Sequence, residues 1–316
     1  MAVTPLAPSS QAVHVALTVD ADWPTLAEAQ PFSRENIPPL EPRHAMSDAI
    51  DVPRFSRVAT NGINLHIAEP GSADGDLLFL LHGFPEFWYG WRNHIGRFAT
   101  AGFWVVVPDQ RGYNLSDKPK GVAAYDLDHV CADIVGLAEG FGRRTSASSD
   151  TIGAQPGVVD GDALCRSHRK IRGARRAASG GVVGAMRNNP VQRRRSRYAR
   201  FFAVAYLPEL PWRQGNFRAI AGSFKDAIRP DAFTENDLRR YRAAWSQPGA
   251  IVINWYPALL RRQMPESNQL RVGLPTLIIR GTQAIFAERE LADASARLCD
   301  DARITYLERS THWVQH

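Results

Sequence analysis

The side chains best placed for chemistry lie in two loops, each directly after a short apolar run. The first loop, 82–86, reads His-Gly-Phe-Pro-Glu, and the second, 109–113, reads Asp-Gln-Arg-Gly-Tyr. The apolar runs before them, 77–81 and 103–107, are typical of parallel strands buried on both faces. Ligand sites of open α/β sheets lie at the carboxyl ends of such strands. We therefore expect the chemistry of this protein to take place at these loops.

The rest of the chain supplies strands and helices that would position the loops. A hairpin is predicted over 57–69 because Asn61-Gly62 is a strong turn signal between two strand patterns. Apolar residues at helical spacing predict a helix over 125–141, and Gly142 is its expected stop. Further helices are predicted over 234–245 (with Thr234 as N-cap and Asp237 three residues on), 250–262 and 287–298, and strands over 275–280 and 304–307.

Together the two loops resemble those of the epoxide hydrolase branch of the α/β-hydrolase family. The resemblance implies an α/β-hydrolase fold, with a mostly parallel central sheet, helices on both faces and a helical lid. It also implies that Phe84 lends its backbone N–H to an oxyanion hole, that Pro85 follows a cis peptide bond, and that Pro85 and Trp88 line the substrate pocket. His-Gly-X-Pro alone is shared with haloalkane and haloacetate dehalogenases, so a related dehalogenase is the first alternative. The Glu-Phe-Trp-Tyr-Gly-Trp-Arg of 86–92 favours epoxide hydrolases.

Hydrolysis of an epoxide to a vicinal diol through an ester requires a carboxylate nucleophile, an acid for the departing oxygen, a base for water and N–H donors for the oxyanion. The resemblance places Tyr198 and Tyr256 as the lid phenols that hold the epoxide oxygen, and His312 as the base. Pro257 stands where the family usually has Arg, and a proline inside a helix costs about 3 kcal/mol. The orientation of Tyr256 is therefore open. No cofactor and no metal are implied.

The expected nucleophile is absent from the sequence as written. The family has an apolar strand ending in Gly-His-Asp-Trp-Gly, whereas 144–184 is rich in Arg, Ala, Gly and Ser and shows no clear period of helix or strand. Asp150 is the one carboxylate near the expected position, without the flanking glycines of a tight elbow. One choice of codons for 146–153, read in a shifted frame, encodes Arg-Leu-Val-Gly-His-Asp-Trp-Gly. We hypothesise that about 145–184 is out of frame, and a divergent insertion is the competing interpretation.

Other parts of the chain also depart from the family pattern. Ala284 stands where the family commonly has the Asp that orients the histidine. The chain stops at His316, where the family continues into a closing helix, so we expect a C-terminal truncation. These departures predict weak or no activity in this chain. The domains are predicted as a disordered or non-native extension over 1–45, the first part of the core over 46–143, the aberrant segment over 144–184, the helical lid over 185–270 and the remaining core over 271–316.

The overall composition limits which partners, metal sites and compartments are expected. The formal net charge is +6, and arginines cluster within 166–200, a pattern that could bind nucleic acid or an acidic partner without catalysis. Because the shifted frame accounts for the cluster up to Arg176, we expect a small-molecule epoxide as partner rather than nucleic acid or a membrane. The 3 cysteines are widely spaced, which predicts neither a disulfide framework nor a zinc site. The sequence has no membrane-spanning apolar run and no signal-peptide pattern, so the cytoplasm is the expected compartment.

Overall fold

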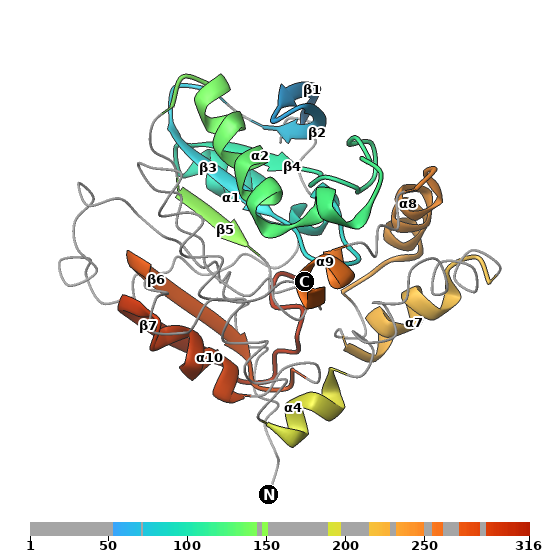
Figure 1. Ribbon diagram of the computed structural model, residues 1–316, viewed down its shortest axis with the longest axis vertical. Helices are drawn as coiled ribbons and strands as arrows, with labels where there is room; N and C mark the ends of the chain where they lie inside the picture. Colours follow the sequence, from blue (N-terminus) through green and yellow to red (C-terminus); the bar gives the residue numbers. More distant parts are fainter. Residues whose placement is uncertain are drawn as a thin grey trace, which may run out of the picture.

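The computed structural model in Figure 1 describes residues 53–70, 72–143, 147–150, 189–196, 215–227, 232–249, 255–261, 272–284 and 289–316. The extension predicted over 1–45, the arginine cluster up to Arg176 and the predicted lid phenol Tyr198 lie outside these residues. Within them, the strands form a five-stranded sheet in the order β1-β2-β4-β3-β5 and a separate parallel pair, β6-β7, and helices pack beside both (Figure 1).

The predicted hairpin forms one edge of the five-stranded sheet. Strands β1 (Arg54–Thr60) and β2 (Ile63–Glu69) pair antiparallel, and β2 continues antiparallel onto β4. Asn61 and Gly62 have φ angles of 45° and 77° between the strands. These left-handed conformations suit Asn and Gly, and they give the turn a twist that matches the strands. The hairpin prediction is therefore confirmed.

Strands β3 (Asp76–Leu81) and β4 (Phe103–Pro108) form the buried parallel centre of the sheet. Successive side chains of a strand point to opposite faces, and here both faces are covered. One face packs against α1 (Ile95–Thr100) and the other against α2 (Leu127–Gly140). The prediction of helices on both faces is thus confirmed. The buried cluster on the α1 side contains Leu78, Leu80, Trp91, Ile95, Val105 and Val107. The buried cluster on the α2 side contains Leu77, Phe79, Leu81, Cys131 and Ile134.

A short strand also forms where the sequence showed no period. Strand β5 (Ala147–Asp150) pairs parallel with β3, and Asp150 lies opposite Leu81 in the register. The reason is that β3 presents backbone N–H and C=O groups on its free side, which pair with any extended chain whatever its side chains. The polar composition of this segment did not prevent strand formation, so that part of our interpretation was wrong.

The chain after residue 271 forms a second parallel unit. Strands β6 (Val272–Gly281) and β7 (Cys299–Leu307) pair over most of their length and are joined through α10 (Arg289–Ala296). The carboxyl end of β6 lies against the loop that follows β7. A Cβ atom on Gly281 would overlap the backbone oxygens of Ser310 and Thr311, so this close approach requires glycine.

The segment predicted as a lid contributes α4 (Pro190–Arg195), α7 (Arg218–Ala227), α8 (Glu235–Ser246) and α9 (Trp255–Arg261). In Figure 1, α7 and α8 lie on the opposite side of the molecule from β6 and β7. Helix α8 begins with the predicted capping box, in which Thr234 and Asp237 exchange hydrogen bonds. Pro257 falls in the first turn of α9, where a backbone N–H has no helical partner to lose. The expected helix disruption therefore does not arise.

Candidate active site

The turn after β3 is fixed by the imidazole of His82. The backbone N–H of Gln110 donates to Nε2 of His82 over 3.0 Å, so Nε2 carries no proton, and Nδ1–H donates to the carbonyl of Gly83 over 3.0 Å. Burial of the ring lowers the pKa of His82, although Asp109 opposes this. With both ring nitrogens engaged and the neutral form favoured, His82 shapes the turn rather than transferring protons. The Phe84-Pro85 peptide bond within this turn is cis, as predicted.

Glu86, the last residue of the motif, is a buried carboxylate. It accepts hydrogen bonds from Tyr241 Oη (3.0 Å), Gln315 Nε2 (2.6 Å) and His316 Nε2 (2.5 Å). Burial opposes ionisation, but the contacts with His316 and Tyr241 outweigh it and hold the pKa of Glu86 below its usual range. The carboxylate is therefore negatively charged at neutral pH.

Aromatic side chains of α8 and α9 close over the same turn. The Trp245 indole N–H donates to the carbonyl of Pro85 over 2.7 Å, and the Tyr256 ring lies edge-on to Phe84 with ring centroids 5.6 Å apart. Tyr256 is fully buried. Trp255 donates to the carbonyl of Arg111 over 3.2 Å in the second loop. The structure thus brings together Phe84, Pro85 and Tyr256, which the sequence predicted as site residues.

The second loop is held in place by buried charges. Asp109 accepts from Nδ1 of His66 (2.7 Å), from Nδ2 of Asn114 (2.7 Å) and from the backbone N–H of Trp88 (2.8 Å). The Trp88 ring packs edge-on against Phe55 of β1, with centroids 5.0 Å apart. Because that contact faces the hairpin and not Tyr256, the assignment of Trp88 to the substrate pocket stays a prediction.

A buried ion pair ties the same loop to α2. The guanidinium of Arg111 meets the carboxylate of Asp133 through two contacts, Nε to Oδ2 and Nη2 to Oδ1, each 2.5 Å long. Both side chains are only 2% exposed. A two-point Arg–carboxylate pair fixes orientation as well as distance. It therefore sets the position of the polar loop relative to the helix.

His312 lies in the loop after β7, as predicted, and its side chain is buried. Burial and the charge of Arg280 together lower the pKa of His312 to about 4, against the opposing charge of Glu86. The imidazole is therefore neutral at neutral pH, which is the form that accepts a proton. A general base requires that state.

The turn after β6 lies beside the His312 loop, where an orienting acid would be needed. The N–H of Gln283 donates to the carbonyl of Ser310 over 2.9 Å, and the neighbouring Ala284 is buried. The guanidinium of Arg195 in α4 donates to the carbonyl of Ala284 over 3.2 Å. Position 284, where the family resemblance predicts the acid, thus lies in this turn and carries only a methyl side chain.

Two predicted site residues are not tested by the described side chains. Tyr198 lies outside the described residues, and Asp150 is described only by its backbone at the end of β5. The sequence analysis also missed Tyr241 and Gln315, which bond Glu86. Tyr241 could have been found, because it falls three residues after Leu238 and so lies on the apolar face of the predicted helix. Gln315 carried no comparable signal.

Comparison with known proteins decides the family. The model of the alpha/beta hydrolase fold matches residues 76–144. The AB hydrolase superfamily protein YfhM of Bacillus subtilis (strain 168) is 36% identical over 265 residues, which cover 82% of this chain and 91% of that protein. The chain belongs to the α/β-hydrolase superfamily. The α/β-hydrolase fold predicted from the two loops is therefore confirmed.

Other proteins similar to this chain are named epoxide hydrolases. Epoxide hydrolase 2 of Caenorhabditis elegans is 29% identical over 275 residues, covering 82% of this chain and 74% of that protein. The crystal structure of Bacillus megaterium epoxide hydrolase in complex with an inhibitor is similar in fold. It has a TM-score of 0.67 at 24% identity and covers 83% of this chain and 94% of that one.

The described residues contain neither a metal-binding cluster nor a membrane-spanning helix. No group of three or more His, Cys, Asp or Glu side chains among them is arranged to hold a metal ion. None of the described helices combines the length and the apolar character needed to cross a bilayer.

Proposed function

We propose that this site is of the epoxide hydrolase type and converts an epoxide to a vicinal diol through an ester intermediate. The observation that carries the proposal is the buried phenol of Tyr256 packed on Phe84, beside the turn that would form the oxyanion hole. A departing epoxide oxygen becomes an alkoxide and needs a hydrogen-bond donor, which a phenol supplies. A halide is stable as the anion, so a halide leaving group needs no proton donor.

The proposed reaction has two steps. A carboxylate attacks a ring carbon, the C–O bond breaks, and Tyr256, with Tyr198 as the second phenol, donates to the developing alkoxide, which takes up a proton from solvent. Neutral His312 then removes a proton from water, and the resulting hydroxide attacks the ester carbonyl. The backbone N–H of Phe84 is assigned to the oxyanion. Collapse of the tetrahedral intermediate expels the second alcohol oxygen, which takes the proton of the new carboxylic acid, so the diol leaves and the carboxylate is regenerated, and the imidazolium returns its proton to solvent.

The nucleophile of the proposed reaction is assigned to the end of β5. Asp150 is our candidate, since the end of β5 lies in register with Leu81, directly before the turn. Ala284 supplies no carboxylate to orient His312. We therefore propose that the chain descends from an active epoxide hydrolase but turns over slowly or not at all. The shifted frame over about 145–184 is our explanation for the missing elbow.

Diol formation from an aryl epoxide such as styrene oxide, followed by chromatography, tests this proposal. Two proteins are compared: the chain as it stands, and a chain whose 145–184 segment is restored to the frame that encodes Gly-His-Asp-Trp-Gly. We expect diol above background from the restored chain alone, and its loss in the restored His312→Gln variant. Rapid diol formation by the unaltered chain would overturn the inactivity proposal. A folded, restored chain without diol formation would overturn the reaction itself.

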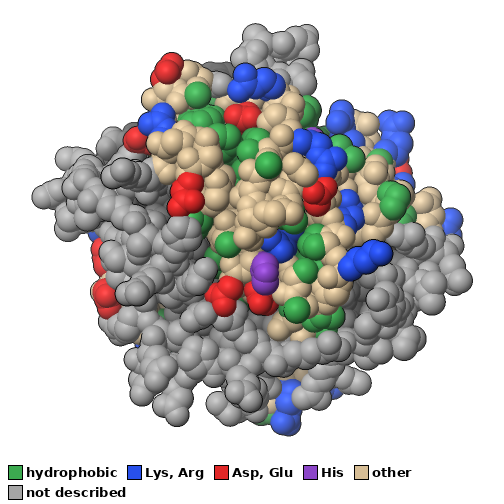
Figure 2. Space-filling view, turned by 45° about the horizontal axis from the view of Figure 1, so that its top comes forward, with side chains coloured by type: hydrophobic (Ala, Val, Ile, Leu, Met, Phe, Trp, Pro, Cys, Tyr) green, Lys and Arg blue, Asp and Glu red, His purple; other side chains and the backbone are tan. Residues whose placement is uncertain are grey.

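Assays on the same two proteins distinguish the alternative functions. Halide release from haloalkanes without epoxide turnover would identify a dehalogenase. Salt-dependent nucleic-acid binding would support a binding protein, but on the face shown in Figure 2 acidic and basic side chains lie interspersed among hydrophobic ones. We propose the cytoplasm as the compartment, and fractionation of cells that express the protein would test it.

A further inference from the structure

Glu86 joins three separate parts of the chain through one carboxylate. It belongs to the turn after β3, accepts from Tyr241 of α8, and accepts from Gln315 and His316 of the loop that carries His312. Only 1% of Glu86 is exposed. A buried carboxylate is stable only when its oxygens are hydrogen-bonded, so each of these contacts is needed where it lies.

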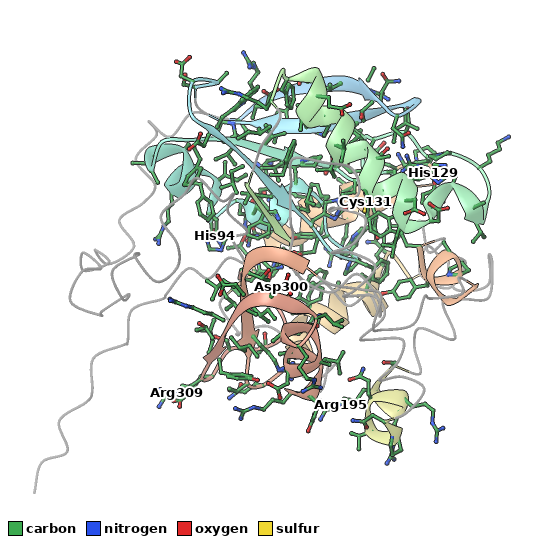
Figure 3. All side chains as sticks on the ribbon, turned by 60° about the vertical axis from the view of Figure 1, so that its left-hand side comes forward. His94, His129, Cys131, Arg195, Asp300 and Arg309 are labelled. Atoms are coloured by element: carbon green, nitrogen blue, oxygen red, sulfur yellow. The ribbon has the colours of Figure 1, made fainter. Side chains whose placement is uncertain are left out.

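Two neighbouring residues accommodate this carboxylate and hold the loop bonded to it. A Cβ atom on Gly90 would come within 2.7 Å of Glu86 Oε1, so glycine leaves the room that the side chain occupies. The Nε2–H of His94 donates to the carbonyl of Gln315 over 2.9 Å and holds the same loop from α1's N-terminal end. Figure 3 shows His94 between the five-stranded sheet and the β6–β7 pair.

The turn after β6 offers the His312 loop no acidic side chain at position 284. At Ala284 a methyl group stands where the acid was predicted, and the described part of the turn bonds the loop and the end of β7 through contacts such as Gln283 N–H to Ser310 O and Thr282 Oγ1 to Leu307 O. The side chains that fix the loop instead converge on Glu86 from three and four residues beyond His312. The loop that carries His312 is thus held by the residues that follow the histidine in the chain.

We propose that Glu86 is a positioning residue that sets the orientation of His312 and locks α8 onto the same turn. The inference rests on the proposed role of His312 as the base. Glu86 does not contact substrate in this assignment and acts only through the loop of residues 312–316 and through Tyr241. A substitution at Glu86 should therefore disturb the His312 ring and α8 together.

The negative charge of Glu86 also acts on His312, in agreement with the contacts described above. Glu86 raises the pKa of His312 against burial and the charge of Arg280, so its negative charge acts at the imidazole. The titratable groups that act on Glu86 itself are His316 and Tyr241, with His82 from its own turn. A neutral amide at position 86 would remove this field and weaken the bonds that hold the loop.

The test is the tautomer state of His312 in ¹⁵N-labelled protein at pH 7, read from long-range ¹H–¹⁵N spectra. We expect one dominant tautomer in the unaltered chain and a fall of the tautomer ratio by about tenfold in Glu86→Gln, on the scale of one lost charged hydrogen bond. Glu69→Gln is the matched control, since Glu69 is also buried and accepts from Ser56 over 3.0 Å, but on β2. It should leave His312 unchanged.

An unchanged His312 pattern in folded Glu86→Gln would overturn the proposal, as would an equal change in Glu69→Gln. If Glu86→Gln does not fold, Tyr241→Phe and Gln315→Leu decide, because each removes one bond and keeps the carboxylate. The proposal requires both to shift the His312 pattern, and an unshifted pattern in either contradicts it. These spectra need no turnover, so a failed epoxide assay would count against the proposed function alone.

Discussion

Two buried tryptophans offer a matched test of how α8 is held on the turn. Trp245 and Trp313 are each 3% exposed, and both pack against Phe224, with ring centroids 5.9 Å and 4.8 Å away. They differ in the indole N–H. That of Trp245 donates to the carbonyl of Pro85 over 2.7 Å, whereas that of Trp313 is buried without an acceptor among the described residues.

This difference sets the magnitude of the prediction. Replacing either tryptophan with Phe removes a similar volume, at a cost on the order of 1 kcal/mol. Trp245→Phe also leaves the Pro85 carbonyl buried and unsatisfied, which adds about 1–3 kcal/mol. Trp313→Phe removes a donor that is already unsatisfied, so it recovers a similar amount. We therefore expect Trp245→Phe to be the more destabilising by at least about 2 kcal/mol.

Urea unfolding followed by circular dichroism measures the difference. With a slope of about 3 kcal/mol per molar urea, the midpoints of the two variants should differ by about 0.7 M, with equal slopes. Equal midpoints, or a lower midpoint for Trp313→Phe, would refute the reasoning. That result would mean that the bond to Pro85 does not hold α8 on the turn.

Further predictions concern buried charges. The folded-state pKa of Glu86 lies below its unfolded value of 4.5, so its ionised form stabilises the fold above that pH, and the benefit disappears as pH falls through the folded pKa. The stability gap between the unaltered chain and Glu86→Gln should be constant above about pH 5 and narrow below about pH 4.5; a gap that widens in acid would contradict this. Asp133→Leu strands the buried Arg111 charge and should cost about 3–5 kcal/mol in urea unfolding, while the Arg111→Leu/Asp133→Leu double variant recovers most of it. A double variant no more stable than Asp133→Leu alone would show that the pair is not coupled.

Local signals in the sequence predicted much of the core. The Asn61-Gly62 turn, the Thr234 capping box and the apolar runs before the two loops each depend on residues close together in the chain. Such short-range chemistry can be read without knowing the fold. The cis peptide bond between Phe84 and Pro85 was predicted from a local motif for the same reason.

Contacts between distant segments could not be predicted in this way. The partners of Glu86 lie 155, 229 and 230 residues away in the chain, and no local pattern pairs a glutamate with them. Strand β5 forms because β3 offers a free edge, which is a property of the sheet and not of the segment's own side chains. Pro257 is tolerated because α9 begins close before it, and helix ends are the least certain part of a sequence-based prediction.

Capture of the ester intermediate tests whether this site opens epoxides. The frame-restored chain with His312→Gln is mixed with excess epoxide, and its intact mass is measured over time. Because the base is removed and the nucleophile kept, we predict a mass increase equal to one substrate molecule, located on the elbow carboxylate by peptide mapping, and slower adduct formation when Tyr256→Phe is added. A folded variant that gains no mass would contradict the assignment of this site to epoxide opening.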